Sequence, residues 1–181
     1  VLLLAAALLL WFLPARWVMP WIEPQLHGLR LQQVQGSLWN GVADKVTAID
    51  GKRLGQLQWQ LSHRALLGQL RLWLAFEGSG LTFSGVARRL PDGRIEARDL
   101  SAHMQLAAPE QRIDTPWGRP AGELQMTASH VLLQGGWPLQ LQAQGQWLHA
   151  DMHTRDGEVA LGAMQLQARA EGGVIQAKWR D

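Results

Sequence analysis

The sequence predicts an all-β fold: an antiparallel sheet of repeated hairpins, curved or two-layered, preceded by one N-terminal transmembrane helix. Three observations support this prediction. The chain starts with an uncharged apolar run, the rest alternates between apolar and polar residues, and Asp-Gly or Asn-Gly pairs separate the alternating stretches. The 181 residues include no Cys, which excludes a disulfide framework and a thiolate nucleophile. A net charge of +2 is too small to indicate a nucleic-acid-binding surface.

The N-terminal run predicts a membrane anchor. Val1–Leu13 is uncharged and consists almost entirely of Leu and Ala. A bilayer crossing takes about 20 apolar residues, so we expect further residues upstream of Val1. The Trp- and Pro-rich stretch that follows suits the headgroup layer. A cleaved leader and a buried core helix are the alternatives, but no small-x-small cleavage site follows the run. We therefore expect residues 1–22 to form a transmembrane signal anchor with an interfacial segment, and residues 23–181 to form a periplasmic β-domain.

The body of the chain predicts strands with one apolar and one polar face. The clearest alternation lies in Gln56–Leu61, Leu139–Trp147 and Met164–Ala168, where Gln alternates with Leu, Trp, Ala or Met. Side chains of a strand alternate between the two faces of its sheet, so each stretch presents a wetted glutamine face and an apolar face. Sheets with one solvated face are typically antiparallel.

The expected connections follow from turn chemistry. Hairpin turns are predicted at Asn40-Gly41, Asp50-Gly51, Pro91-Asp92-Gly93 and Asp156-Gly157. A turn of helix is conceivable at Ala65–Leu67, but Gly68 and the alternation that follows favour strand. The stretch Ala107–Ala121 contains three Pro and predicts a loop.

No set of residues predicts catalysis, a cofactor or a metal site, and we expect the protein not to be an enzyme. His149 and His153 are the best candidates for metal ligands because they are four residues apart. On a strand that spacing corresponds to about 13 Å, which is too far for one ion. A wetted face accounts for them more simply.

Contact surfaces are predicted at three of the 10 Trp residues. Trp73 shares a strand face with Arg71, opposite the neighbouring leucines, and an exposed aromatic beside Arg is typical of a protein contact. Trp117 and Trp137 lie beside Gly and Pro in expected loops. We expect Trp73, Arg71, Trp117 and Trp137 to be partner contacts, with core packing as the alternative for tryptophans generally.

A series of short elements resembles a known family. Leu13–Val18 follows the apolar run, then come Val34–Gly41, with the pattern Gly-Ser-Leu-Trp-x-Gly, and Leu54–Ser62, with Gly-x-Leu-x-Trp-x-Leu-Ser. The later stretches Gly145–Trp147, Val159–Gly162 and Glu171–Ile175 fit the same family. In this order they are similar to protein N of the type II secretion system.

The resemblance implies a single-pass protein of the bacterial inner membrane with its main domain in the periplasm. It implies an accessory, non-enzymatic role in exporting folded proteins across the outer membrane. The expected partners are the inner-membrane platform components and the outer-membrane secretin. Because members of the family run on past the position of Asp181, the resemblance also implies that the β-domain is truncated at its C-terminal end.

A second hypothesis is a periplasmic lipid-binding or lipid-transfer module. The apolar face of a long curved sheet could form a trough for acyl chains. Whether that face stays open or is covered by a second layer would distinguish this hypothesis from the first.

Overall fold

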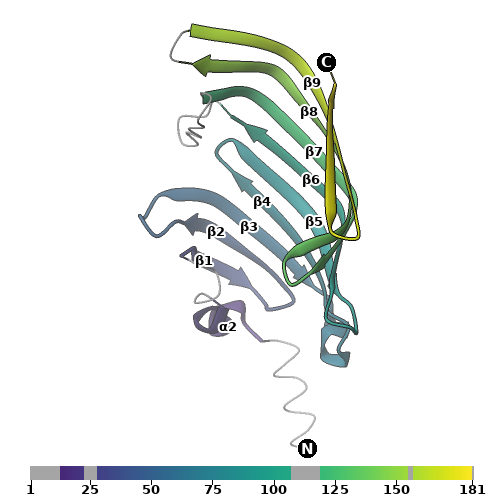
Figure 1. Ribbon diagram of the computed structural model, residues 1–181. Coiled ribbons are helices and arrows are strands. Elements are labelled where there is room, and N and C mark those ends of the chain that lie inside the picture. The colour runs from purple at the N-terminus through teal and green to yellow at the C-terminus, as the bar shows by residue number, and fades with distance from the viewer. Residues whose placement is uncertain (1–12, 23–27, 107–118, 155–156, 181) are drawn as a thin grey trace, which may run out of the picture. The chain divides into compact units, whose positions relative to one another are not determined.

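The computed structural model describes residues 13–22, 28–106, 119–154 and 157–180 (Figure 1). The expected anchor run of residues 1–12 lies outside the described residues. The fold is all-β and antiparallel, as predicted. The chain divides into two compact units, Val1–Gly78 and Ser79–Asp181.

The first unit contains a short helix and a four-stranded sheet. Its elements are α2 (Ala15–Ile22), β1 (Arg30–Gly36), β2 (Asn40–Thr47), β3 (Arg53–Leu61), the 3-10 helix η2 (His63–Leu67) and β4 (Arg71–Gly78). Strands that follow one another in sequence pair antiparallel, so the sheet is a series of hairpins.

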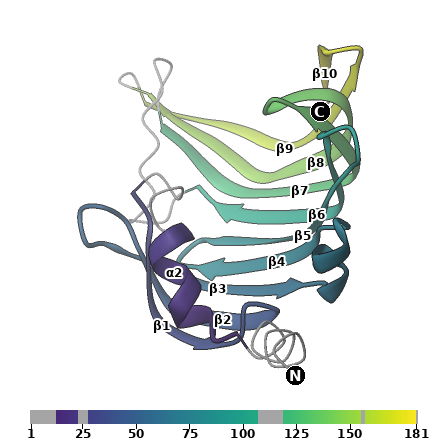
Figure 2. The same ribbon diagram turned by 90° about the horizontal axis from the view of Figure 1, so that it is seen from below.

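The core of this unit lies on one face of its sheet. Leu57 pairs with Phe76 and Trp59 with Leu74, which places these four side chains on the same face. The buried cluster also contains Ala15 of α2, which packs with residues of β1 and β2 (Figure 2). The opposite face carries the glutamines of β3, as the alternation predicted.

The second unit is a six-stranded sheet with long strands. Its elements are β5 (Leu81–Arg89), β6 (Ile95–Gln105), β7 (Arg119–Gln134), β8 (Trp137–Thr154), β9 (Gly157–Glu171) and β10 (Val174–Arg180). Consecutive strands again pair antiparallel. Strands β7 to β9 bend along their length (Figure 1), and their register shifts at several irregular positions.

Within each described unit the strands form a single layer, so the curved form of the prediction applies there and the two-layered form does not. In the second unit, Ala97, Ala128 and Val131 are buried together, and Leu100, Leu133 and Leu141 pack against them half-buried. Among the described residues, no helix is both long enough and apolar enough to cross a bilayer.

Three predicted connections need correction. Asn40-Gly41 is not a turn, since Asn40 begins β2 and the reversal occurs at Ser37–Trp39. Ser37 closes this earlier turn: its N–H donates to the Asn40 carbonyl at 2.8 Å and its Oγ accepts from the Asn40 N–H at 3.2 Å. The predicted turns at Asp50-Gly51 and Pro91–Gly93 are confirmed. Asp156 lies outside the described residues.

Ala65–Leu67 is helical and not extended, which is the second difference from the prediction. Ser62 caps η2 by accepting a hydrogen bond from the Arg64 N–H at 3.3 Å, and Gly68 ends it in the left-handed conformation. The third concerns the expected loop Ala107–Ala121. Its last three residues, Arg119–Ala121, belong to β7, and 107–118 lie outside the described residues.

Candidate contact surfaces

The two sequence elements that carry the family resemblance meet in space. Gly41 on β2 pairs with Trp59 on β3, and the indole lies directly over the glycine. A Cβ atom at Gly41 would lie 2.3 Å from Trp59 Cζ2, so only glycine leaves room for the ring. Trp59 Nε1 donates to the Leu38 carbonyl at 3.2 Å, which holds the ring in place. This glycine and this tryptophan therefore form one packing unit.

Trp39, the tryptophan of the Gly-Ser-Leu-Trp-x-Gly element, also packs against another part of the first unit. Trp39 is buried and stacks on His63, with ring centroids 4.6 Å apart and an interplanar angle of 25°. Its carbonyl accepts from the Leu61 N–H at 2.7 Å. The neighbouring Leu38 N–H donates to the Leu13 carbonyl at 2.9 Å. The motif thus joins the β1–β2 turn to the end of β3 and to the first described residue.

Trp73 and Arg71 lie on the predicted face of β4. Trp73 pairs with Gln60, whereas Leu72 and Leu74 pair with Leu61 and Trp59 on the apolar face. Trp73 is 36% exposed and Arg71 is exposed. The prediction of the face is confirmed. An exposed indole beside a guanidinium on a glutamine-rich surface is available for contact.

Trp137 is the first residue of strand β8 and not part of a loop as predicted, because the β7–β8 turn takes only Gly135 and Gly136; its side chain is exposed. Its Nε1 donates to the Gly173 carbonyl at 3.1 Å, so the indole edge is held against the β9–β10 turn. Trp117 lies outside the described residues. Because Trp73 belongs to the first unit and Trp137 to the second, each forms a separate candidate surface.

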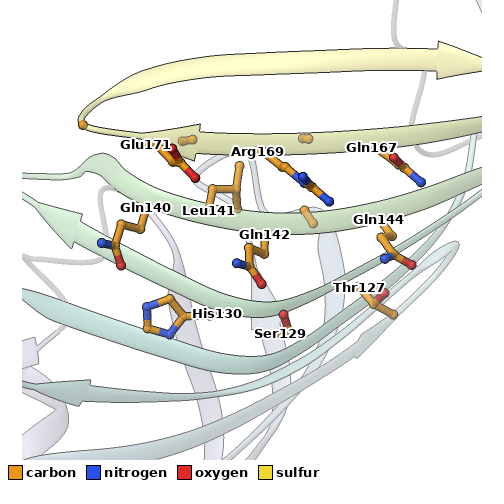
Figure 3. Close-up of a pocket in the computed structure, with 14 residues that line it drawn as sticks. Thr127, Ser129, His130, Gln140, Leu141, Gln142, Gln144, Gln167, Arg169 and Glu171 are labelled. Carbon is orange, nitrogen blue, oxygen red and sulfur yellow. The ribbon is translucent and has the colours of Figure 1, made fainter.

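A hollow of about 730 Å³ lies on the polar face of β7, β8 and β9 (Figure 3). Its polar lining consists of Thr127, Ser129, His130, Gln140, Gln142, Gln144, Gln167, Arg169 and Glu171. The alternation of Gln140–Gln144 predicted a wetted face here, but it did not predict a hollow. The hollow depends on the bending of the strands, which arises from their pairing and irregular register.

An ion cluster extends this polar face. The Glu96 side chain is only 7% exposed and binds two guanidinium groups, Nε of Arg88 and Nη2 of Arg98, the latter at 2.8 Å. His130, which lines the hollow, places Nδ1 3.6 Å from the Glu96 carboxylate. Arg98 first, and then Arg88, hold the pKa of the Glu96 carboxyl below its ordinary value, against the opposing effect of burial. Sequence reasoning missed this cluster because only Arg98 shares a strand with Glu96, whereas Arg88 on β5 and His130 on β7 reach it across strands.

The packed and exposed tryptophans, the polar hollow and the ion cluster are suited to structural roles and to contacts with other molecules. In the described part of the chain no three His, Asp or Glu side chains are grouped as a metal site would require. His149 occupies an irregular position with a positive φ of 49°, where the register of β8 and β9 shifts between Trp147 and Ala150. The regular alternation of side chains between the two faces of the strand, on which the prediction for His149 depended, is therefore broken at this position.

The fold and these surfaces define an antiparallel β-sheet protein that exposes aromatic and polar side chains. The family described as type II secretion system (T2SS), protein N, matches residues 27–181. The chain therefore belongs to this family, which confirms the resemblance inferred from the motifs. Membership indicates a role in type II secretion, as an accessory component associated with the cell envelope. No curated protein and no solved structure matches the chain.

Proposed function

We propose that this protein is a non-enzymatic accessory component of the type II secretion machinery. Val1–Leu13 anchors it in the inner membrane, and residues 23–181 lie in the periplasm. There it contacts the inner-membrane platform components and the outer-membrane secretin. The family match over residues 27–181 is the observation that carries this proposal.

The exposed aromatic residues support contact as its mode of action. Trp73 and Arg71 lie on the face of β4 opposite the core of the first unit, and their indole and guanidinium groups point outward. An anchor confines such a surface to a thin layer beside the membrane, which raises its effective concentration for neighbouring proteins. Weak, wet contacts are then sufficient for assembly.

In-cell photocrosslinking tests the proposal. A photoreactive amino acid replaces Trp73, Trp117 or Trp137 in turn, with Gln32, an exposed position on β1, as the matched control. We expect Trp73 to capture a platform component or the secretin, and the control position to capture neither. Equal capture from Trp73 and Gln32 would contradict the assignment of Trp73 as a contact.

The lipid-binding alternative has one observation in its favour. In the second unit, apolar side chains such as Leu124, Leu141 and Leu166 are only half-buried, and no second sheet of that unit covers them among the described residues. The hollow, however, is lined mainly by polar side chains rather than by this apolar face. Capture of lipid alone from all three tryptophan positions would favour the alternative over the secretion-component contact.

A further inference from the structure

The connection between β3 and β4 exposes a group of leucines. Leu67 on η2 is 82% exposed, Leu66 is 51% exposed, and Leu70 just before β4 is also exposed. Single exposed leucines are ordinary, but three in one short connection mark an interaction site. The turn is ordered by the Ser62 cap and by Gly68, whose N–H donates to the Ala65 carbonyl at 3.0 Å. The leucines are therefore held outward by the fold.

The charges around this connection are all of one sign. From Leu54 to Phe76 the chain contains no Asp or Glu. Arg64 and Arg71 are exposed at the two ends of the leucine group, and among the described residues neither forms an ion pair with a carboxylate. An apolar tip flanked by basic side chains is the composition that binds an anionic lipid surface.

The position of the connection points to the same partner. The Leu38 N–H bonds the Leu13 carbonyl, which places the end of the N-terminal apolar run beside the β1–β2 turn. Next in that turn, Trp39 stacks on His63, the first residue of η2. The exposed leucines thus lie in the neighbourhood of the point where the apolar run joins the first unit. Trp17 on α2 is exposed as well.

We propose that Ser62–Arg71, here called the docking loop, binds the surface of the lipid bilayer. Leu66 and Leu67 enter the boundary between headgroups and acyl chains, where burial of apolar area favours them. Arg64 and Arg71 remain at the level of anionic headgroups. This inference rests on the proposed anchor, because the anchor brings the membrane to this end of the unit. The docking loop then gives the first unit a second attachment and a defined orientation on the membrane.

The absence of native Cys allows a direct test with single thiols in the full chain. Leu67→Cys carries an environment-sensitive fluorophore, and Ile49→Cys is the matched control. Ile49 is 81% exposed, but it lies in the β2–β3 turn, at the other end of the strands from η2. Both proteins are reconstituted in vesicles of phosphatidylethanolamine and phosphatidylglycerol. Some of these lipids carry a quencher on the acyl chain.

The expected result is a blue-shifted emission and strong lipid quenching for the label at position 67, with a water-like emission and little quenching at position 49. In the Leu67→Cys protein, the added substitution Leu66→Ser should reduce the quenching. Arg64→Gln with Arg71→Gln should reduce it in anionic vesicles but not in vesicles of phosphatidylcholine. Equal, water-like signals at the two positions would overturn the inference. So would shielding of position 67 that requires added secretion components instead of lipid.

Carbonate extraction of the same vesicles separates this inference from the proposed anchor. If the chain resists extraction but the label at position 67 has a water-like emission, the result supports the anchor and contradicts the docking loop. If the chain is extracted but the label at position 67 was quenched by lipid before extraction, the result supports the docking loop and contradicts the anchor.

Discussion

At Gly41 the lack of a side chain determines where the largest side chain of the neighbouring strand lies. Trp59 is nearly buried over this glycine, and its Nε1 is committed to the Leu38 carbonyl. The ring cannot move aside without losing that hydrogen bond. The two family elements of the sequence are therefore linked by steric complementarity between one small residue and one large residue.

Gly41→Ala should lower the free energy of unfolding by about 1–3 kcal/mol, because the added methyl group overlaps the indole. Gly145→Ala is the comparison: a Cβ there would approach the Gln125 carbonyl oxygen to 3.2 Å, a tight contact but a much less severe one than at Gly41. Urea denaturation measures both. Trp59→Leu should remove the part of the Gly41→Ala penalty that arises from the indole in a double-mutant cycle, and the contact of the new Cβ with the Gln35 carbonyl oxygen at 2.9 Å should account for the rest. If the two glycine substitutions cost the same, the steric account is wrong.

Glu96 makes the stability of the second unit dependent on pH. Its pKa is lower in the folded protein than the ordinary value of 4.5, because Arg98 and Arg88 stabilise the carboxylate. A lowered pKa means that the folded state binds the proton less well than the unfolded state does. The ion cluster therefore contributes its full stability above about pH 4.5, and the contribution is lost as the pH falls through the lowered pKa.

Glu96→Gln should reduce the free energy of unfolding by about 1 kcal/mol at pH 7, a modest value because both guanidinium groups are half-exposed to solvent. The difference from the wild type should shrink below pH 4.5. Urea denaturation between pH 3 and pH 7 checks this, with the exposed Glu77→Gln as control. A difference that stays constant over that range would show that the charge of Glu96 is not what stabilises the cluster.

At the scale of an element, η2 shows that residues at the two ends of a helix can outweigh the hydrophobic alternation of the flanking sequence. The alternation after Gly68 favoured a strand, but Ser62 and Gly68 supply the two ends of a short helix, and their effect is independent of hydrophobic period. The helix ends where Gly68 adopts a φ of +81°, a conformation that β-branched residues strongly avoid.

Gly68→Val should therefore destabilise the protein by about 1–2 kcal/mol. A Cβ at this position would meet no atom within 4 Å, so the expected cost is backbone strain and not a clash of the Cβ. Gly68→Asn is the matched control, because Asn tolerates the left-handed conformation. Thermal denaturation followed by circular dichroism compares the two. Equal midpoints for the Val and Asn variants would contradict the strain argument.

At the scale of the whole molecule, the proposed anchor predicts where the protein is found and whether it works. Removal of Val1–Leu13 should release the domain from the membrane fraction and abolish its support of secretion. This deletion also removes the carbonyl that binds the Leu38 N–H. A deletion that ends at Phe12 retains that bond and separates loss of the anchor from loss of a local contact.

Fractionation and a secretion assay of both deletions provide the measurement. An unrelated transmembrane helix fused before Leu13 should restore function if attachment is what matters. A released domain that supports secretion as well as the tethered one would show that the anchor is unnecessary.

The sequence by itself determined which way the side chains of the clearly alternating strands face. Trp73 lies opposite Leu72 and Leu74 as predicted, because the alternation of side chains along a strand is a local property of extended backbone. The Asp50-Gly51 turn was predictable for a similar reason, since glycine can adopt the positive φ of Gly51 without steric cost, and this is a local property of the residue.

Only the tertiary structure decided what depends on a partner strand. The Asn40-Gly41 pair reads as a turn, yet Gly41 is needed within β2 to receive Trp59, and Ser37 closes the reversal instead. Glu96 and Arg88 meet because β5 and β6 pair in one register, and the hollow forms because irregular register bends β7 to β9. Register and bending are set by contacts between residues distant in sequence, so no local pattern contains them.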